Sequence, residues 1–133
     1  MFVRKIFLSL IIGAFLITAT AHAEIQTYSG SGQYFMTDET IDFAKNKAEL
    51  DAQRNVLEKI CVYINSQTEI NANVLENDEI ITVSAGILRI VDTKFSMEPD
   101  DAGITVKAFV TAEIDSDELK TLLDRAINER KGE

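Results

Sequence analysis

The sequence holds two runs of carboxylates, Asp100-Asp101 and Asp115-Ser116-Asp117-Glu118, whose residue types could bind calcium. An EF-hand loop needs a glycine at its sixth position and a glutamate at its twelfth. Counted from Asp115, these positions hold Lys120 and Ala126, so the calcium motif fails. Aspartates also form turns and cap helices. We therefore predict a turn and a helix cap at these runs, and no metal site.

A pair of carboxylates could also hydrolyse a glycosidic bond. The acid of such a pair needs an apolar surrounding that raises its pKa, and every acid here lies in a polar stretch without an aromatic cleft. The only histidine, His22, lies in an N-terminal segment that we expect to be removed. The mature chain then has no histidine for a Ser-His-Asp or Cys-His device. We expect no catalytic residues, and an acid-only hydrolase is the weaker alternative.

Gly30-Ser31-Gly32 provides the first two glycines of a dinucleotide-binding loop. Phe35 stands where that loop needs its third glycine, and the mature chain leaves no room for the strand that must precede it. We therefore expect no cofactor. Glycine within a strand lets another backbone approach closely, which predicts that a helix packs on Gly30 and Gly32.

Cys61 is the only cysteine of the chain. One cysteine excludes an internal disulfide, and one cysteine with one histidine cannot provide the four ligands of a structural zinc site. Cys61 lies beside Leu57 and Ile64 on a predicted helix, which favours a small buried apolar role. The alternative is an intermolecular disulfide, since a lone exported cysteine can pair with another chain.

The first 23 residues have the pattern of a secretory signal peptide. Arg4 and Lys5 give a positive start, and the uncharged, largely apolar run of 13 residues from Ile6 to Thr18 follows. Ala21-His22-Ala23 matches a cleavage site, so we expect cleavage before Glu24. The run is shorter than the roughly 20 residues of a membrane-spanning helix. We expect an exported protein, periplasmic or secreted, with no transmembrane segment after signal cleavage.

The charge balance excludes nucleic acid as a partner. The chain has 13 Lys+Arg against 22 Asp+Glu, and loss of Arg4 and Lys5 leaves 11 against 22, a net charge of −11 over residues 24–133. Nucleic-acid phosphates need a basic surface. The chain is 46% apolar and 26% charged, which is typical of a globular protein. We therefore expect a signal peptide over residues 1–23 and one domain over residues 24–133.

The first elements follow from the period of the apolar residues. Residues 25–36 alternate as a strand, with one face made of Tyr28, Gly30, Gly32, Tyr34 and Met36. A helix is predicted from Thr37, its N-cap, to about Asn65. Steps of four give a small-residue stripe of Ala44, Ala48, Ala52, Val56 and Ile60, and steps of seven give a second stripe of Phe43, Leu50, Leu57 and Ile64. A helix apolar on two sides is expected to be sandwiched.

The second half of the chain predicts shorter elements. Residues 68–74 alternate as a half-buried strand, and residues 77–86 form a short helix that ends at Gly86. Strands are expected over residues 87–98 and 104–114, joined by a turn over residues 99–103. The later strand has the clearest covered face, with Ile104, Val106, Ala108, Val110, Ala112 and Ile114.

Asp115 and Glu118 predict the start of a last helix, on which Leu119, Leu122, Leu123, Ala126 and Ile127 have helical spacing. The element order is therefore β-α-β-α-β-β-α. Without regular βαβ alternation, this order predicts an α+β fold. We expect an antiparallel sheet of about four strands with the helices packed on one face.

Several motifs spread over residues 28–114 occur together: G-x-G-x-Y before a helix, the alanine stripe, Tyr63-Ile64-Asn65-Ser66-Gln67-Thr68, Ser84-x-Gly86 and a V-x-A-x-V-x-A-x-I strand. In these the chain resembles the LPP-twenty-type surface lipoprotein family and the similar N-terminal domain of the flagellar-assembly T protein. The resemblance implies a small α+β envelope domain, used in assembly or protein contacts, without catalytic residues. The chain departs from that family by lacking the lipid-acceptor cysteine, so no lipid anchor is expected.

The face of the sheet opposite the helices is the candidate contact surface. Phe109 lies there, with Lys107 and Thr111 beside it, and Phe35 joins it if Tyr34 points toward the helices. Buried aromatic residues dominate the energy of interfaces. We therefore expect binding of a protein partner or self-association. A carrier of a small ligand, held between sheet and helices, is the alternative, although the core positions are mostly small aliphatic residues.

Overall fold

The computed structural model describes residues 24–67 and 72–132. Its elements are β1 (Ile25–Met36), α2 (Ile41–Ser66), the 3-10 helix η1 (Ala72–Val74), α3 (Asn77–Ile87), β2 (Arg89–Pro99), β3 (Ile104–Asp115) and α4 (Ser116–Lys131). The predicted signal peptide over residues 1–23 lies outside the described residues.

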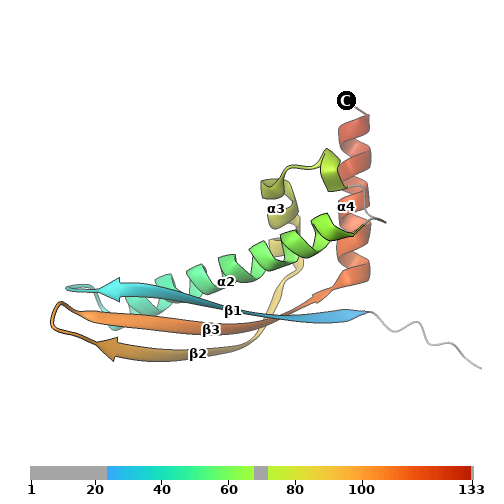
Figure 1. Ribbon diagram of the computed structural model, residues 1–133. Coiled ribbons are helices and arrows are strands. Elements are labelled where there is room, and N and C mark those ends of the chain that lie inside the picture. The colour runs from blue at the N-terminus through green and yellow to red at the C-terminus, as the bar shows by residue number, and fades with distance from the viewer. Residues whose placement is uncertain (1–23, 68–71, 133) are drawn as a thin grey trace, which may run out of the picture.

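The strands form one antiparallel sheet in the order β1-β3-β2. Figure 1 shows α2 lying along one face of this sheet, with α3 and α4 gathered at one end. The fold is therefore α+β, with an antiparallel sheet and helices, as predicted. The described chain has three strands and not about four. Of the strand expected over residues 68–74, Ala72–Val74 form a 3-10 helix and residues 68–71 lie outside the described residues.

Helix α2 begins later than its sequence predicts. Thr40 is the N-cap, and its hydroxyl accepts a hydrogen bond from the Phe43 N–H at 3.2 Å. The prediction that Thr37 is the cap was therefore wrong. Thr37 instead donates its backbone N–H to Glu39 Oε2 at 2.9 Å, in the turn between β1 and α2. Both threonines can cap, and the turn needs the residues between them to reverse the chain.

The small-residue stripe of α2 packs directly on the glycines of β1. All five residues of the stripe are fully buried: Ala44, Ala48, Ala52, Val56 and Ile60. A Cβ atom built on Gly32 would lie 2.2 Å from the Ala52 nitrogen and 2.5 Å from the Ala48 oxygen. Only glycine permits this approach, which confirms the packing predicted from Gly30 and Gly32.

The outer edge of β1 is bonded by side chains of the same helix. We call these residues, Asp51, Asn55 and Lys59, the α2 ladder. Asp51 Oδ2 accepts from the Gln33 N–H at 3.0 Å, Asn55 Nδ2 donates to the Ser31 carbonyl, and Lys59 Nζ donates to the Ser29 carbonyl. Three backbone groups that would face solvent at this edge therefore have partners within the chain.

The second stripe of α2 is not buried as a whole. Phe43 and Leu50 are exposed, whereas Ile64 near the C-terminal end of the helix is buried. The prediction of a sandwiched helix was therefore wrong for most of its length. The reason is the position of α3 and α4 at one end of the molecule, where they cover only the last turns of α2 (Figure 1).

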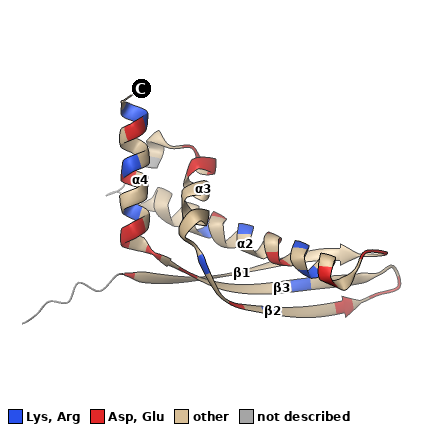
Figure 2. Ribbon diagram, turned by 180° about the vertical axis from the view of Figure 1, so that it is seen from behind, with Lys and Arg blue, Asp and Glu red and all other residues tan. Residues whose placement is uncertain are grey.

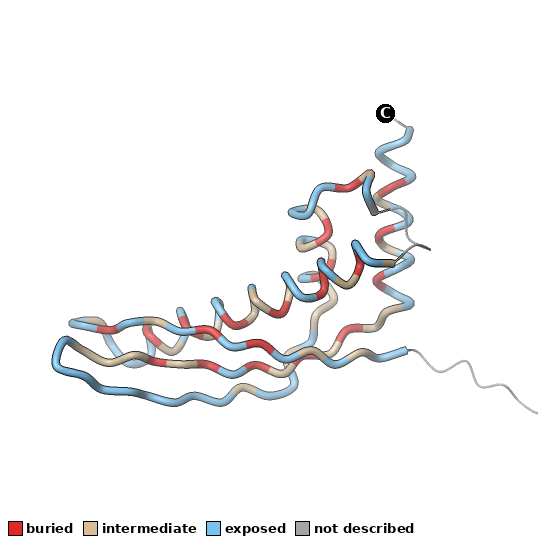
Figure 3. The backbone as a smooth tube through the Cα atoms, viewed as in Figure 1, coloured by how far each residue is buried: buried red, intermediate tan, exposed pale blue. Residues whose placement is uncertain are grey.

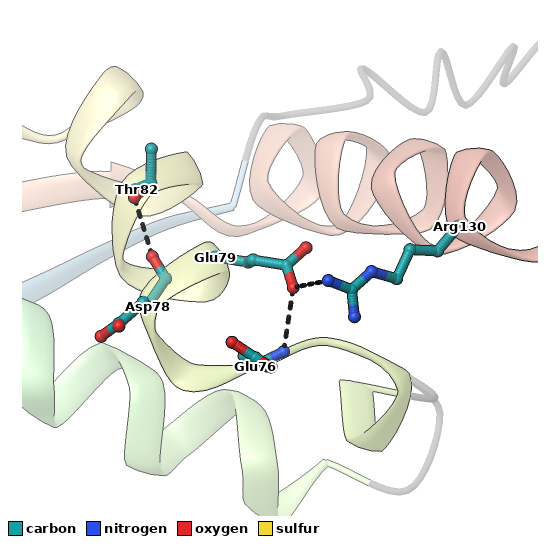
Figure 4. Close-up of polar contacts among 5 residues, drawn as sticks. All are labelled: Glu76, Asp78, Glu79, Thr82 and Arg130. Carbon is teal, nitrogen blue, oxygen red and sulfur yellow. Dashed lines mark hydrogen bonds and ion pairs between the residues drawn. The ribbon is translucent and has the colours of Figure 1, made fainter. Parts of the chain in front are cut away.

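Helices α3 and α4 are joined by an ion pair as well as by apolar packing. Glu79 Oε1 lies 2.7 Å from Arg130 Nη2 and also accepts from the Glu76 N–H at 3.4 Å (Figure 4). Leu119, Leu123 and Ile127 form the buried side of α4. The short helix was predicted correctly, although Gly86 lies within it and the helix ends at Ile87.

The β2–β3 hairpin and the start of α4 follow the aspartate chemistry predicted from the sequence. Asp100 Oδ1 accepts from the N–H groups of Ala102 and Gly103 at 2.7 and 2.9 Å. Asp115 Oδ1 accepts from the N–H groups of Asp117 and Glu118 at 3.0 and 3.2 Å. Both carboxylate runs therefore serve the backbone, as a turn and as a helix cap.

Candidate contact surface on the open face of the sheet

The sheet has one face under α2 and one open face. The alternating residues of β3 divide cleanly: Val106, Ala108, Val110 and Ala112 are buried under the helix, whereas Phe109 is exposed on the other side. On β1 the odd-numbered residues from Ile25 to Phe35 are exposed. No helix in the described part of the chain lies over this face (Figure 1).

Phe109 lies in the middle of the open face. Its neighbours across the sheet are Ser31 on β1 and Lys94 on β2. Lys107 and Thr111 lie two residues away on the same strand and therefore on the same face. Although these side chains surround it, 48% of Phe109 is exposed.

Phe35 shares this face but lies apart from Phe109. It pairs with Thr105, four positions along the register from the Ser31–Phe109 pair. At a strand rise of about 3.3 Å per residue, the two residues are roughly 13 Å apart. Phe35 is 45% exposed and packs near Gly103 in the hairpin. The structure thus places both aromatics on one face as expected, at two separate points.

The charged residues of the open face pair with each other across the strands. Lys107 Nζ lies 3.0 Å from Glu98 Oε1, and Arg89 pairs with Glu113. Figure 2 shows that residues of both charges also occur along α2 and α4. A partner bound to this face would contact exposed aromatic residues that lie among side chains of both charges.

Two groups with shifted pKa values lie elsewhere, at the turn before α2. Tyr34 Oη donates to Glu39 Oε1 at 3.0 Å, which raises the pKa of Tyr34. The Thr37 N–H, followed by other hydrogen bonds, lowers the pKa of the Glu39 carboxyl. The Tyr34 ring also meets Phe43 edge-on, with centroids 5.7 Å apart. This cluster stabilises the turn between β1 and α2.

Cys61 lies on the covered side of α2 near its C-terminal end. It is 5% exposed, and burial raises the pKa of its thiol more than the hydrogen bond from Asn65 Nδ2, 3.6 Å from the sulfur, lowers it. A buried protonated thiol is a poor nucleophile. These features favour the structural interpretation, and an intermolecular disulfide stays a hypothesis.

Two hollows in the described part of the chain open broadly to solvent. One of about 390 Å³ lies over Phe109 and reaches Lys59 and Lys94. Another, of about 460 Å³, lies between the ladder side of α2 and Ser31. Between α2 and the glycines of β1 there is only direct contact. The described residues also hold no group of three or more His, Cys, Asp or Glu side chains placed to bind a metal ion.

Sequence reasoning missed a second exposed apolar group, on β2. Phe95 and Met97 are 37% and 40% exposed although they lie on the helix side of the sheet. Helix α2 lies over β1 and β3 and reaches β2 through side chains, such as Lys45, whose Nζ lies 5.3 Å from the Phe95 ring centroid. The glycines of β1 were the feature of the sequence that could have predicted this exposure. Their lack of side chains lets α2 pack closely on β1, which leaves β2 uncovered.

The fold defines a small α+β protein with one helix-covered face and one open face. No family model and no curated protein matches this chain. None of the helices that the structure describes is both long enough and apolar enough to cross a membrane.

Proposed function

We propose that the chain is an exported cell-envelope protein that acts without catalysis, through protein–protein contacts or assembly. The observation that carries the proposal is the open face of the sheet, with Phe109 and Phe35 exposed on adjacent strands. Exposed aromatics on a face without a covering helix are suited to anchor a partner. The signal-peptide pattern of residues 1–23 supports export to the periplasm or beyond.

Two features favour contact over the alternatives. The interface between α2 and β1 is filled by backbone contact, which leaves no space there for a small ligand. Asp100 and Asp115, one from each carboxylate run, accept hydrogen bonds from backbone N–H groups, which suits a structural role better than hydrolysis. The resemblance to the LPP-twenty-type and flagellar-assembly domains adds a role in envelope or flagellar assembly to the proposal.

Sedimentation of the mature protein with and without Phe109→Ser tests the surface. We expect the variant to keep its circular dichroism spectrum, because the ring contributes little to the core. Its apparent mass in sedimentation at micromolar concentration should be lower than that of the wild type. Leu50→Ser is the matched control, because Leu50 is also an exposed apolar residue but lies on α2. Unfolding of Phe109→Ser would place Phe109 in the core. Identical monomeric masses for wild type and variant would overturn self-association through this face.

A further inference from the structure

The two edges of the sheet differ in the hydrogen bonds that side chains make to their backbones. The edge of β1 is bonded by the α2 ladder. For β2, no side-chain hydrogen bond among the described residues ends on the strand backbone, and its residues are exposed along most of its length (Figure 3). A strand with an unpaired edge is a template for another strand. The open edge of this sheet is therefore β2.

The part of β2 able to pair is its second half. The register with β3 is irregular between Ile90 and Asp92, and it is regular from Thr93 to Pro99. A bulge disturbs pairing where it lies, and proline ends a ladder because it lacks an N–H. A docking strand would therefore meet the segment from Thr93 to Pro99, centred on Ser96.

We propose that this edge binds the same edge of a second copy of the chain, antiparallel and with Ser96 facing Ser96 at a two-fold axis. The inference rests on the proposed function only in taking the chain to act through protein contacts. In such a pair, residues equally far from Ser96 face each other and lie on the same side of the sheet. The two sheets become continuous through β2, and both copies of α2 lie on the same side.

The charges of β2 match their own copy in this register. Lys94 faces Glu98 of the second copy, and the symmetry makes this pair twice. The two side chains are well exposed, at 78% for Lys94 and 63% for Glu98. Among the described residues of its own chain, Lys94 lies 3.8 Å from Asp92 and Glu98 lies 3.0 Å from Lys107, so the partner's charge would join an existing ion pair at each position. Opposite charges directly across an antiparallel pair are favourable.

The apolar residues of β2 match in the same register. Phe95 faces Met97 of the second copy, again twice, on the helix side that α2 leaves uncovered. Four partly exposed side chains would thus form one cluster along the two-fold axis. Sulfur–aromatic contacts of this kind are favourable. The pairing therefore covers the exposed apolar group that the monomer leaves beyond the reach of α2.

Neighbouring registers are worse. Centring the pair on Lys94 sets two like charges directly opposite each other, and centring it on Phe95 sets Asp92 against Glu98. Centring on Met97 pairs Lys94 with the turn residue Asp100, beyond the end of the strand. Like charges directly opposite are destabilising. In the register centred on Ser96, Asp92 lies level with Asp100 of the second copy, but both residues lie outside the segment from Thr93 to Pro99. Among these registers, only this one pairs opposite charges and apolar residues within that segment.

Charge reversal at the two positions tests the pairing. We expect the mature wild type to sediment as a dimer at tens of micromolar, and Lys94→Glu and Glu98→Lys each to sediment as a monomer. An equimolar mixture of the two variants should return to the dimer, because each substituted position then faces the opposite charge. Circular dichroism of each variant alone reports folding.

Cysteine cross-linking gives an independent readout. Cα atoms directly opposite in an antiparallel pair lie about 4.5–5.5 Å apart, within the span of a disulfide. Under mild oxidation Ser96→Cys should form a covalent dimer. Ser29→Cys is the control, because Ser29 is an exposed serine on the other edge strand, where the α2 ladder covers the edge.

Three results would overturn the pairing: a monomeric wild type in which Ser96→Cys does not cross-link, a dimer that both charge variants leave unchanged, or a mixture that stays monomeric. If the dimer is lost in Phe109→Ser but kept in Lys94→Glu, the copies meet through the open face. The proposed function then stands and the β2 inference fails. If the dimer is lost in Lys94→Glu but kept in Phe109→Ser, the copies pair through the β2 edge. Phe109 would then contact a different partner.

Discussion

A methyl group added at Gly32 tests the contact between α2 and β1. The new Cβ would lie 2.2 Å from the Ala52 nitrogen and 2.5 Å from the Ala48 oxygen. Both atoms belong to the backbone, so no rotation of a side chain relieves the overlap. Ordinary contact begins near 3.4 Å, so the helix must move away by about 1 Å, and a gap of that size forfeits up to about half of each dispersion contact.

We expect Gly32→Ala to lower the free energy of unfolding by about 3 kcal/mol, the upper end of the usual cost of overpacking. For a domain of this size the midpoint of thermal unfolding should fall by more than about 10 °C. Guanidinium denaturation, followed by circular dichroism, measures the change. The backbone must shift because the stripe on α2 is fully buried and has no slack to absorb the methyl group.

Gly86→Ala is the matched control for Gly32→Ala. A Cβ at Gly86 meets nothing within 4 Å, and the residue lies inside α3. The same substitution should there stabilise the protein by about 0.5–1 kcal/mol, because alanine favours a helix over glycine. A Gly32→Ala variant as stable as the wild type would refute the direct helix–strand contact. Equal losses at both glycines would show that the effect is not specific to the contact.

Two further predictions concern α4 and the thiol. Leu123→Ala should cost about 2–5 kcal/mol, because Leu123 is fully buried, whereas the exposed neighbour in Asp124→Ala should change stability by less than about 0.5 kcal/mol; equal losses in urea denaturation would refute the orientation of α4. Cys61 should react with iodoacetamide at least about tenfold more slowly in the native protein than in guanidinium. Because its pKa is raised, the native rate should rise only at a higher pH than in the unfolded chain, and coinciding pH profiles would contradict the burial.

The local elements of this fold could be predicted largely from residue spacing. Alternation located β1 and β3, and the two glycines with the alanine stripe predicted which surfaces meet. Such contacts are predictable because only small residues permit so close an approach. The glycines and alanines themselves therefore mark the place of contact in the sequence. The capping role of Asp115 was equally local, since its carboxylate serves N–H groups two and three residues away.

What could not be predicted depends on distant parts of the chain. Phe43 and Leu50 have helical spacing, but their exposure follows from where α3 and α4 lie, which no local period encodes. Thr37 and Thr40 are both suitable caps, and the turn between β1 and α2 places Thr40 at the N-cap position. For the candidate contact surface, the side of the sheet on which Phe109 lies was predicted from the alternation of β3. The open edge at β2 was not predicted, because it depends on how closely α2 packs over β1.

The α2 ladder has a consequence for how helix and strand stay aligned. Four residues of a helix advance about 6.0 Å and two residues of a strand about 6.6 Å, so the two periods nearly match over the two steps of the ladder. Length alone would then permit α2 to slide by one turn against β1. The order of donors and acceptors forbids a slide that brings Lys47 to the Gln33 N–H, because two donors would meet and Asp51 would face a carbonyl. Spacing thus defines a set of similar alignments, and the polarity of the ladder excludes this neighbouring one.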